Sequence, residues 1–283
     1  MLTDAATKAL LYAAVLQTIG AAAAFWVVMP SVARSADSEG RTRAEHAIRR
    51  VGLRASVAVV VALMLRAWAQ TATAFGFAQS VSLGALSTIM VESRWGHSWQ
   101  IQVLAALASV VAFASVGRGR RSVHVATAMT SAALSLTLTR TGHAAGAPDR
   151  MAIHTAHVLG AGMWVGTLTT LVAVRRSLDR AARQSVFRAF SRVALTGAAM
   201  LVTAGLVASW WYVGAFANLW STVYGRVLLG KVALVGGVVV CGYVNWRAIG
   251  SGRSEPGQAA IVELMLAAAV VVATGVLTEL EHP

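Results

Sequence analysis

Residues 151–174 read MAIHTAHVLGAGMWVGTLTTLVAV, an uncharged stretch bounded by Arg150 and Arg175. It is long enough to cross the hydrocarbon core of a bilayer, which takes roughly 20 residues of helix. The whole chain of 283 residues shares this character, with 57% hydrophobic residues, 12% charged residues and a mean hydropathy of +0.65. Soluble globular proteins carry about 25% charged residues. The composition therefore excludes a soluble domain, and it also excludes a disordered chain, which needs low hydrophobicity and high charge.

Working outward between the charged positions gives eight apolar stretches of similar length. They cover residues 9–29, 55–77, 98–116, 122–143, 151–174, 193–216, 227–246 and 258–278. We therefore predict an all-α, polytopic integral membrane protein with eight transmembrane helices joined by loops, and no appended soluble domain. The first stretch is longer than the core of a signal peptide, which has about 7–15 residues, so we expect it to be a retained span.

Basic residues are unevenly shared between the two sides of the predicted bundle. Of 24 Lys and Arg residues, 17 lie in the segments 34–54, 118–121, 175–192 and 247–253, and five lie in the loops of the opposite side. Lys and Arg concentrate in cytoplasmic loops, so we predict that both termini are periplasmic. The same loops account for the net charge of +13. We infer that the partner of this charge is the lipid bilayer and not nucleic acid.

The two halves of the chain are faintly alike. Residues 93–96 (SRWG) before the third stretch parallel residues 222–225 (TVYG) before the seventh. Such matches suggest two parallel four-helix repeats, although short matches also arise by chance. For domain organisation we take residues 1–120 as the N-terminal transmembrane half with helices one to three, and residues 121–283 as the C-terminal half with helices four to eight.

Residues able to bind a metal gather at the outer side of the fourth and fifth stretches. His154 and His157 are neighbours on one helix face because they are three positions apart. His143 ends the preceding stretch, and Met151 lies one turn before His154. Cu(I) accepts imidazole and thioether ligands, so we expect Cu(I) rather than Cu(II), and the single Cys241 excludes a site made of paired thiolates. We predict a copper site of these His and Met residues. The alternative is that each His is interfacial and bonded to backbone or water.

Other polar residues on the predicted outer side are candidates for an accessory role. They are His97, His282 and Glu279, which would form an acidic, imidazole-bearing vestibule that attracts cations. The alternative is that they are solvated ends of helices, since chain termini often fray.

Three charged residues fall inside predicted spans: Arg66, Lys231 and Glu263. Lys231 is about 7.5 Å from the outer end of its helix and Glu263 is equally deep from the inner end, so these two should not pair. The two buried cations need an acceptor. We expect Arg66 and Lys231 to share one, and Glu279 is the nearest candidate by depth, with the carbonyls at a helix C-terminus as the alternative. Lys231 either extends its ammonium group to the interface as an anchor or gates the metal site.

Five short pieces occur in order in the second half of the chain. They are TGHAA at 141–145, HTAHVLGAGMWVG at 154–166, FSRVA at 190–194, TAG at 203–205 and TVYGR at 222–226. With these pieces the sequence resembles the copper resistance protein D (CopD) family of bacterial inner-membrane proteins linked to copper handling. The resemblance implies a copper donor that is a separate periplasmic CopC-like carrier. It also implies functional positions at His143, His154, His157, Arg226 and Lys231.

The residues and the resemblance together predict a copper-binding membrane protein that takes up or translocates copper across the inner membrane. We predict no enzymatic activity, since no phosphate-binding loop, nucleophile elbow or zincin motif occurs. Two alternatives stay open. One is a haem-binding oxidoreductase or electron carrier, with Arg66 and Lys231 on the haem propionates. The other is a chaperone-like assembly factor for a copper oxidase, which binds copper without transporting it.

Overall fold

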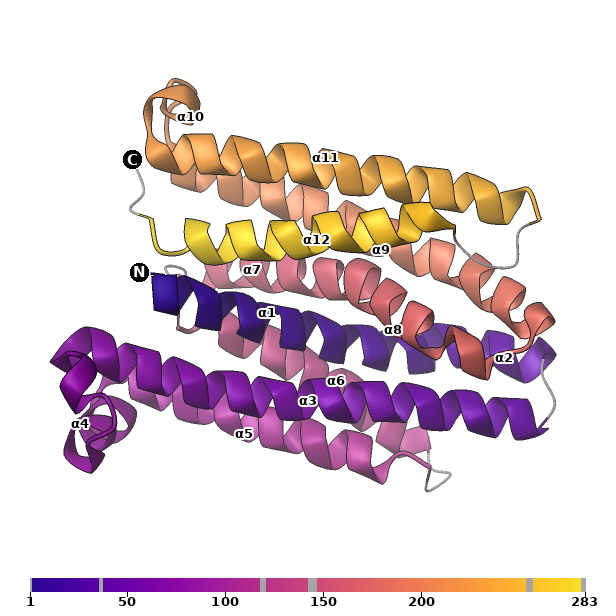
Figure 1. Cartoon of the computed structure of the whole chain (residues 1–283), viewed down its shortest axis with the longest axis horizontal. Coiled ribbons are helices and arrows are strands. Elements are labelled where there is room, and N and C mark those ends of the chain that lie inside the picture. Colours follow the sequence, from indigo (N-terminus) through magenta and orange to yellow (C-terminus); the bar gives the residue numbers. More distant parts are fainter. Residues whose placement is uncertain (1, 36–37, 118–120, 142–146, 253–256, 281–283) are drawn as a thin grey trace.

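The computed structural model describes residues 2–35, 38–117, 121–141, 147–252 and 257–280, and within these ranges it contains helices and no strand. The long helices lie side by side along one axis (Figure 1). The start of the first helix and the end of the last lie at the same end of the bundle, where Lys8 Nζ donates to the carbonyl oxygen of Thr278 at 3.2 Å. The predicted all-α fold is confirmed.

Two of the long rods are helices interrupted by a π-helical turn. The first consists of α1 (Leu2–Ala23), η1 (Ala24–Val28) and α2 (Met29–Ser35). The second consists of α7 (Pro148–Ala161), η4 (Gly162–Gly166) and α8 (Thr167–Val174), and ends in η5 (Arg175–Ser177). The other long helices are α3 (Ser38–Phe75), α5 (Arg94–Ser115), α6 (Arg121–Thr139), α9 (Arg180–Val213), α11 (Val223–Gly250) and α12 (Gln258–Leu277). Short elements at the end where the chain begins are η2 (Phe77–Gln79), α4 (Leu83–Ser87), η3 (Thr88–Glu92) and α10 (Asn218–Ser221).

Seven helices of the described chain are long and apolar enough to cross a membrane. They are Thr3–Val32, Ser38–Phe75, Arg94–Ser115, Pro148–Ser177, Arg180–Val213, Val223–Gly250 and Gln258–Leu277. The predicted stretch 122–143 forms α6, which packs against α1, α5 and α7 but is not among these seven. Its many Ser and Thr residues lower its hydropathy, and their hydroxyls donate to carbonyls of the preceding turn, as Ser131 does to Thr127 at 2.7 Å. The eighth span and the periplasmic termini stay predictions.

Two Arg-rich segments that we predicted to be loops are helical. The helix α3 begins at Ser38 and α9 begins at Arg180, well before residues 55 and 193. Arg is a strong helix former, so a run of Arg ends the apolar stretch without ending the helix. With 38 residues, α3 is about 57 Å long. The hydrocarbon core is about 30 Å thick, so the first turns of α3 extend beyond it.

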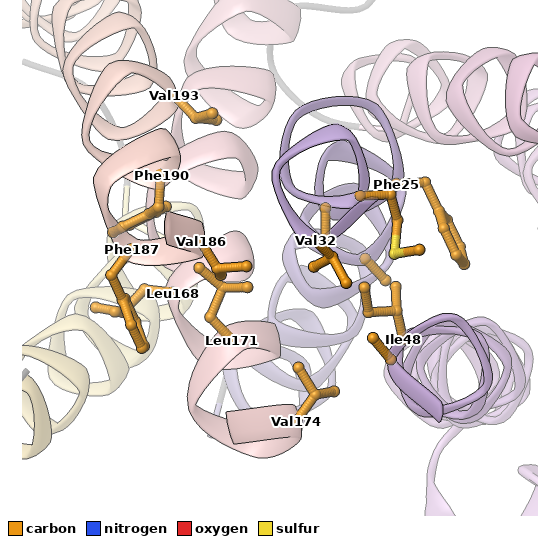
Figure 2. Close-up of a cluster of buried hydrophobic side chains, with 14 of the residues drawn as sticks. Phe25, Val32, Ile48, Leu168, Leu171, Val174, Val186, Phe187, Phe190 and Val193 are labelled. Atoms are coloured by element: carbon orange, nitrogen blue, oxygen red, sulfur yellow. The ribbon is translucent and has the colours of Figure 1, made fainter. Parts of the chain in front are cut away.

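The main apolar core fills the half of the bundle farther from Leu2. Figure 2 shows part of this core, in which Phe25, Leu171 and Phe187 are at most 3% exposed. The rods containing α1 and η4 touch backbone to backbone, because a Cβ at Gly166 would lie 1.9 Å from the carbonyl oxygen of Leu16. This close contact fixes the position of the second rod, which carries the predicted His ligands.

The two segments that looked alike in sequence begin helices in the same way. The side chain of Ser93 accepts a hydrogen bond from the Gly96 amide at 2.9 Å, and Thr222 accepts one from the Gly225 amide at 3.0 Å. These are standard N-caps of α5 and α11. The four-helix repeat stays a prediction.

Candidate metal site

A cavity of about 210 Å³ lies in the half of the bundle where the chain begins. Side chains of α1, α3, α6, α7, α9, α11 and α12 line it. Most of the lining is apolar, and it carries the three tyrosines Tyr12, Tyr212 and Tyr224. Its charged and imidazole-bearing residues are Lys8, Arg66, His154, His157 and Lys231. A mostly apolar cavity with a few converging polar groups is the usual form of a ligand site.

Helix α7 carries both imidazoles that reach the cavity. The helix starts with Pro148 in its first turn, where a missing amide hydrogen costs nothing. His157 donates from Nδ1 to the carbonyl oxygen of Leu201 on α9 at 3.1 Å. This bond fixes the ring and leaves Nε2 with its lone pair, which is how proteins orient a metal-binding His. The geometry therefore makes His157 Nε2 the best-placed metal donor of the cavity.

The second imidazole, His154, is engaged with a tyrosine. Its Nε2 lies 3.2 Å from the hydroxyl of Tyr212 on α9, and the two rings are tilted at 5.7 Å between centroids. A metal bound to Nε2 of His154 would replace this hydrogen bond. Both imidazoles thus line one cavity, as their spacing in the sequence predicts.

Three other predicted site residues, Met151, Arg226 and His97, are described by the structure and do not line the cavity. Met151 is half-buried on α7 and does not line the cavity, and Arg226 is exposed on α11. His97 is exposed on α5, with Nδ1 2.9 Å from the carbonyl oxygen of Ser93. His143 and His282 lie outside the described residues. Within the described chain, no three His, Cys, Asp or Glu side chains form a group that could hold a metal.

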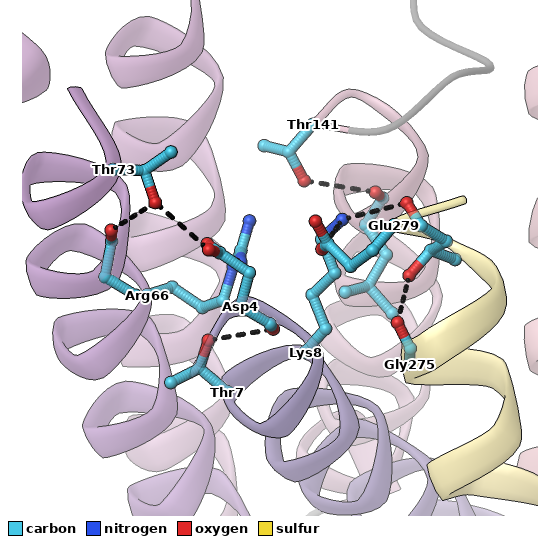
Figure 3. A network of polar contacts seen from close by, with 11 residues as sticks. Asp4, Thr7, Lys8, Arg66, Thr73, Thr141, Gly275 and Glu279 are labelled. Atoms are coloured by element: carbon cyan, nitrogen blue, oxygen red, sulfur yellow. Dashed lines mark hydrogen bonds and ion pairs between the residues drawn. The ribbon is translucent and has the colours of Figure 1, made fainter. Parts of the chain in front are cut away.

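Two ion pairs join α1 to its neighbours at the cavity (Figure 3). Asp4 accepts from Arg66 Nη1 at 3.3 Å and from Thr73 Oγ1 at 3.0 Å, and so links α1 to α3. Lys8 forms an ion pair with Glu279 at the end of α12. The prediction that Arg66 and Lys231 share Glu279 as their acceptor is therefore wrong, because Arg66 pairs with Asp4 and Glu279 pairs with Lys8. The sequence signal that could have predicted both pairs is the presence of two charged residues, Asp4 and Lys8, one helical turn apart at the start of α1.

Lys231 stands apart from these pairs. It lines the cavity, yet within the described ranges it has neither a hydrogen-bond nor an ion-pair partner. The expectation that it does not pair with Glu263 is confirmed, since the Glu263 carboxylate accepts from Trp164 and Asn245 instead. The cavity therefore carries one cation with no counter-charge from the described chain.

A bundle that contains seven apolar, membrane-length helices, and a mostly apolar cavity with a few polar groups, defines a multi-pass integral membrane protein. This chain belongs to the copper resistance protein D family. The family's "Copper resistance protein D-like, N-terminal domain" matches residues 2–152, and "Copper resistance protein D" matches residues 184–277. The predicted family is confirmed, and the match extends into the first half of the chain; the piece at 154–166 lies between the two matched regions.

One curated relative is the "Copper transport protein CutJ" of Bacillus subtilis. The two are 26% identical over 254 residues, which are 83% of this chain and 46% of CutJ. The chain thus spans about half the length of the relative that it matches. No solved structure matches the chain. Family membership gives the protein a copper-related membrane function.

Proposed function

We propose that this protein moves copper across the bacterial inner membrane and that His154 and His157 are its first ligands. The observation that carries the proposal is that both imidazoles of α7 line one cavity, with His157 oriented by Leu201 so that Nε2 is available. Imidazole is a suitable donor for copper, and Cu(I) accepts low coordination by such ligands. The similarity to a protein described as a copper transporter supports the same cargo.

In this proposal the end of the bundle where the chain begins faces the periplasm. Copper enters the cavity beside the ion pairs Asp4–Arg66 and Lys8–Glu279, and a separate CopC-like carrier is the donor. Cu(I) binds His157 Nε2 first. It then binds His154 Nε2, where it replaces the hydrogen bond to the Tyr212 hydroxyl. We retain His143 as the third donor, with Met151 as the alternative, although Met151 does not line the cavity in this structure.

The geometry supports copper better than haem. Two axial His ligands bind opposite faces of one haem, which two imidazoles on the same face of one helix cannot do. His154 and His157 share α7, and no other His of the described chain lines the cavity. The volume of about 210 Å³ is also below the range of roughly 300–1,000 Å³ that drug-sized ligands occupy.

The test is copper accumulation in proteoliposomes together with a Cu(I) competition titration and an absorption spectrum. We expect the parent to bind and accumulate copper without a Soret band, and His154→Ala with His157→Ala to lose both activities. His46→Ala is the matched control, because His46 is exposed on α3 and away from the cavity. Unchanged accumulation in the double variant would overturn the site. Binding without accumulation in the parent would instead favour an assembly factor.

A further inference from the structure

A buried carboxylate lies in the half of the bundle opposite the cavity. Glu263 on α12 is 2% exposed, whereas the residues of the same helix that line the cavity begin at Val270. Two helical turns, about 10 Å, separate these positions. An ionisable side chain inside a membrane bundle costs free energy and marks a functional site by default.

Two neutral groups hold the Glu263 carboxylate. Trp164 Nε1 donates to Oε1 at 3.0 Å, and Asn245 Nδ2 donates to Oε2 at 2.7 Å. The neighbours one turn away on α12, Ala260 and Ala267, are apolar and buried.

Among the described residues, no titratable side chain forms a hydrogen bond or an ion pair with this carboxylate. From α11 the facing groups are Asn245 and Gly242, and from η4 the facing group is Trp164. Helix α1 approaches α12 closely at Gly275, where an added Cβ would lie 2.6 Å from the carbonyl oxygen of Ala5, three turns beyond Glu263. The ion pairs of the described residues all involve other carboxylates. A charge at Glu263 is thus stabilised by two neutral donors alone, and a buried charge without a counter-ion is costly.

The amide of Asn245 has a spare acceptor. Asn245 is 7% exposed, and its Oδ1 meets no donor within the part of the chain that the structure describes. Turning a primary amide by 180° exchanges its oxygen and nitrogen. With Glu263 ionised, Nδ2 donates to Oε2. With Glu263 protonated, the new O–H at Oε2 donates to Oδ1 of the turned amide. One residue pair therefore serves both protonation states.

We propose that Glu263 is a proton-binding site that exchanges one proton for one Cu(I) during transport. The proton binds at Oε2 and leaves from it, and no redox step is involved. The link to the cavity is the π-helical turn η4: Ala161, just before this turn, lines the cavity, and Trp164 lies three residues further along the same rod. Entry of one Cu(I) and release of one proton leave the charge inside the bundle unchanged. The proton site stands on geometry alone, and only its coupling to copper rests on the proposed function.

The first experiment tests the proton site without copper. Infrared difference spectra of the protein in liposomes, recorded while the pH is changed, should show the carbonyl stretch of a buried carboxylic acid. The stretch should vanish in Glu263→Gln and persist in Glu39→Gln, whose carboxylate is exposed on α3. Trp164→Phe should change the frequency of the stretch, because the carbonyl loses a donor. Spectra of Glu263→Gln identical to those of the parent would overturn the proton site.

The second experiment tests the coupling. An imposed pH gradient should drive copper accumulation in proteoliposomes of the parent, and Glu263→Gln should still bind Cu(I) but lose the response to the gradient. An equal response of parent and variant would overturn the coupling. If the parent carries no copper at all, the proposed function fails, and the infrared spectra still decide the proton site.

Discussion

Asp4 and Arg66 form a buried ion pair between α1 and α3, with 3.3 Å between Oδ1 and Nη1. Arg66 is 5% exposed and Asp4 is 7% exposed, so neither reaches bulk water. This pair explains how a guanidinium is tolerated inside an apolar helix. It also fixes the start of α1, on which Lys8, one helical turn after Asp4, lines the cavity.

Removing the acid of this pair should destabilise the protein strongly. Asp4→Asn leaves the Arg66 guanidinium buried without a counter-charge, and loss of one partner of a buried pair costs about 3–5 kcal/mol. We expect a clear drop in the thermal unfolding midpoint in detergent. Thr73→Val is the control: it deletes one hydrogen bond to Asp4 and should cost about 1 kcal/mol. A larger loss in Thr73→Val than in Asp4→Asn would contradict the ion-pair account.

Tyr212 should compete with copper for His154. The hydroxyl lies 3.2 Å from Nε2, and a hydrogen bond of this kind contributes about 0.5–1.5 kcal/mol. Tyr212→Phe should therefore bind Cu(I) up to about tenfold more tightly in a competition titration. Tyr224→Phe, from the same cavity but without this contact to His154, should bind like the parent. Weaker binding by Tyr212→Phe would show that the hydroxyl orients the imidazole rather than blocking it.

Lys231 should oppose the binding of a cation in the cavity. Its charge has no partner in the described chain, and like charges repel more strongly in a low-dielectric interior than in water. Lys231→Met keeps the apolar stem and removes the charge, so we expect tighter Cu(I) binding and slower release into the vesicle lumen. Lys231→Arg retains the charge and should resemble the parent in affinity. If Lys231→Met binds and transports copper like the parent, Lys231 is an anchor and takes no part in the mechanism.

The contact between α1 and η4 should tolerate no added carbon. A Cβ at Gly166 would lie 1.9 Å from the backbone oxygen of Leu16, which cannot swing away as a flexible side chain does. Gly166→Ala should cost about 1–3 kcal/mol, the usual effect of overpacking. Gly230→Ala on α11 is the matched control, since nothing lies within 4 Å of its added Cβ. Differential scanning fluorimetry in detergent compares the two, and equal midpoints would refute the close backbone contact.

Much of the fold could be predicted from one-dimensional patterns. Hydrophobic length predicted the long helices, because a membrane span depends on local composition. The same rule misplaced the starts of α3 and α9, since a charged residue ends an apolar stretch but not a helix. Hydrophobic length also predicted that α6 is a membrane span, whereas the hydroxyl-rich sequence of α6 has a lower hydropathy than the seven candidate spans. The π-helical turn η4 has no such sequence signature, and it depends on packing against α1.

The candidate site likewise has features that the sequence determines and features that only the tertiary structure determines. Spacing alone placed His154 and His157 on one face of a helix, because i and i+3 are neighbours in any α-helix. Tertiary structure decided their surroundings: Leu201 orients one ring and Tyr212 engages the other, both from α9. It also paired Arg66 with Asp4, 62 positions away, and left Lys231 without a partner in the described chain. Helical periodicity is a local property of the chain, whereas the partner of a buried charge depends on which helices pack together.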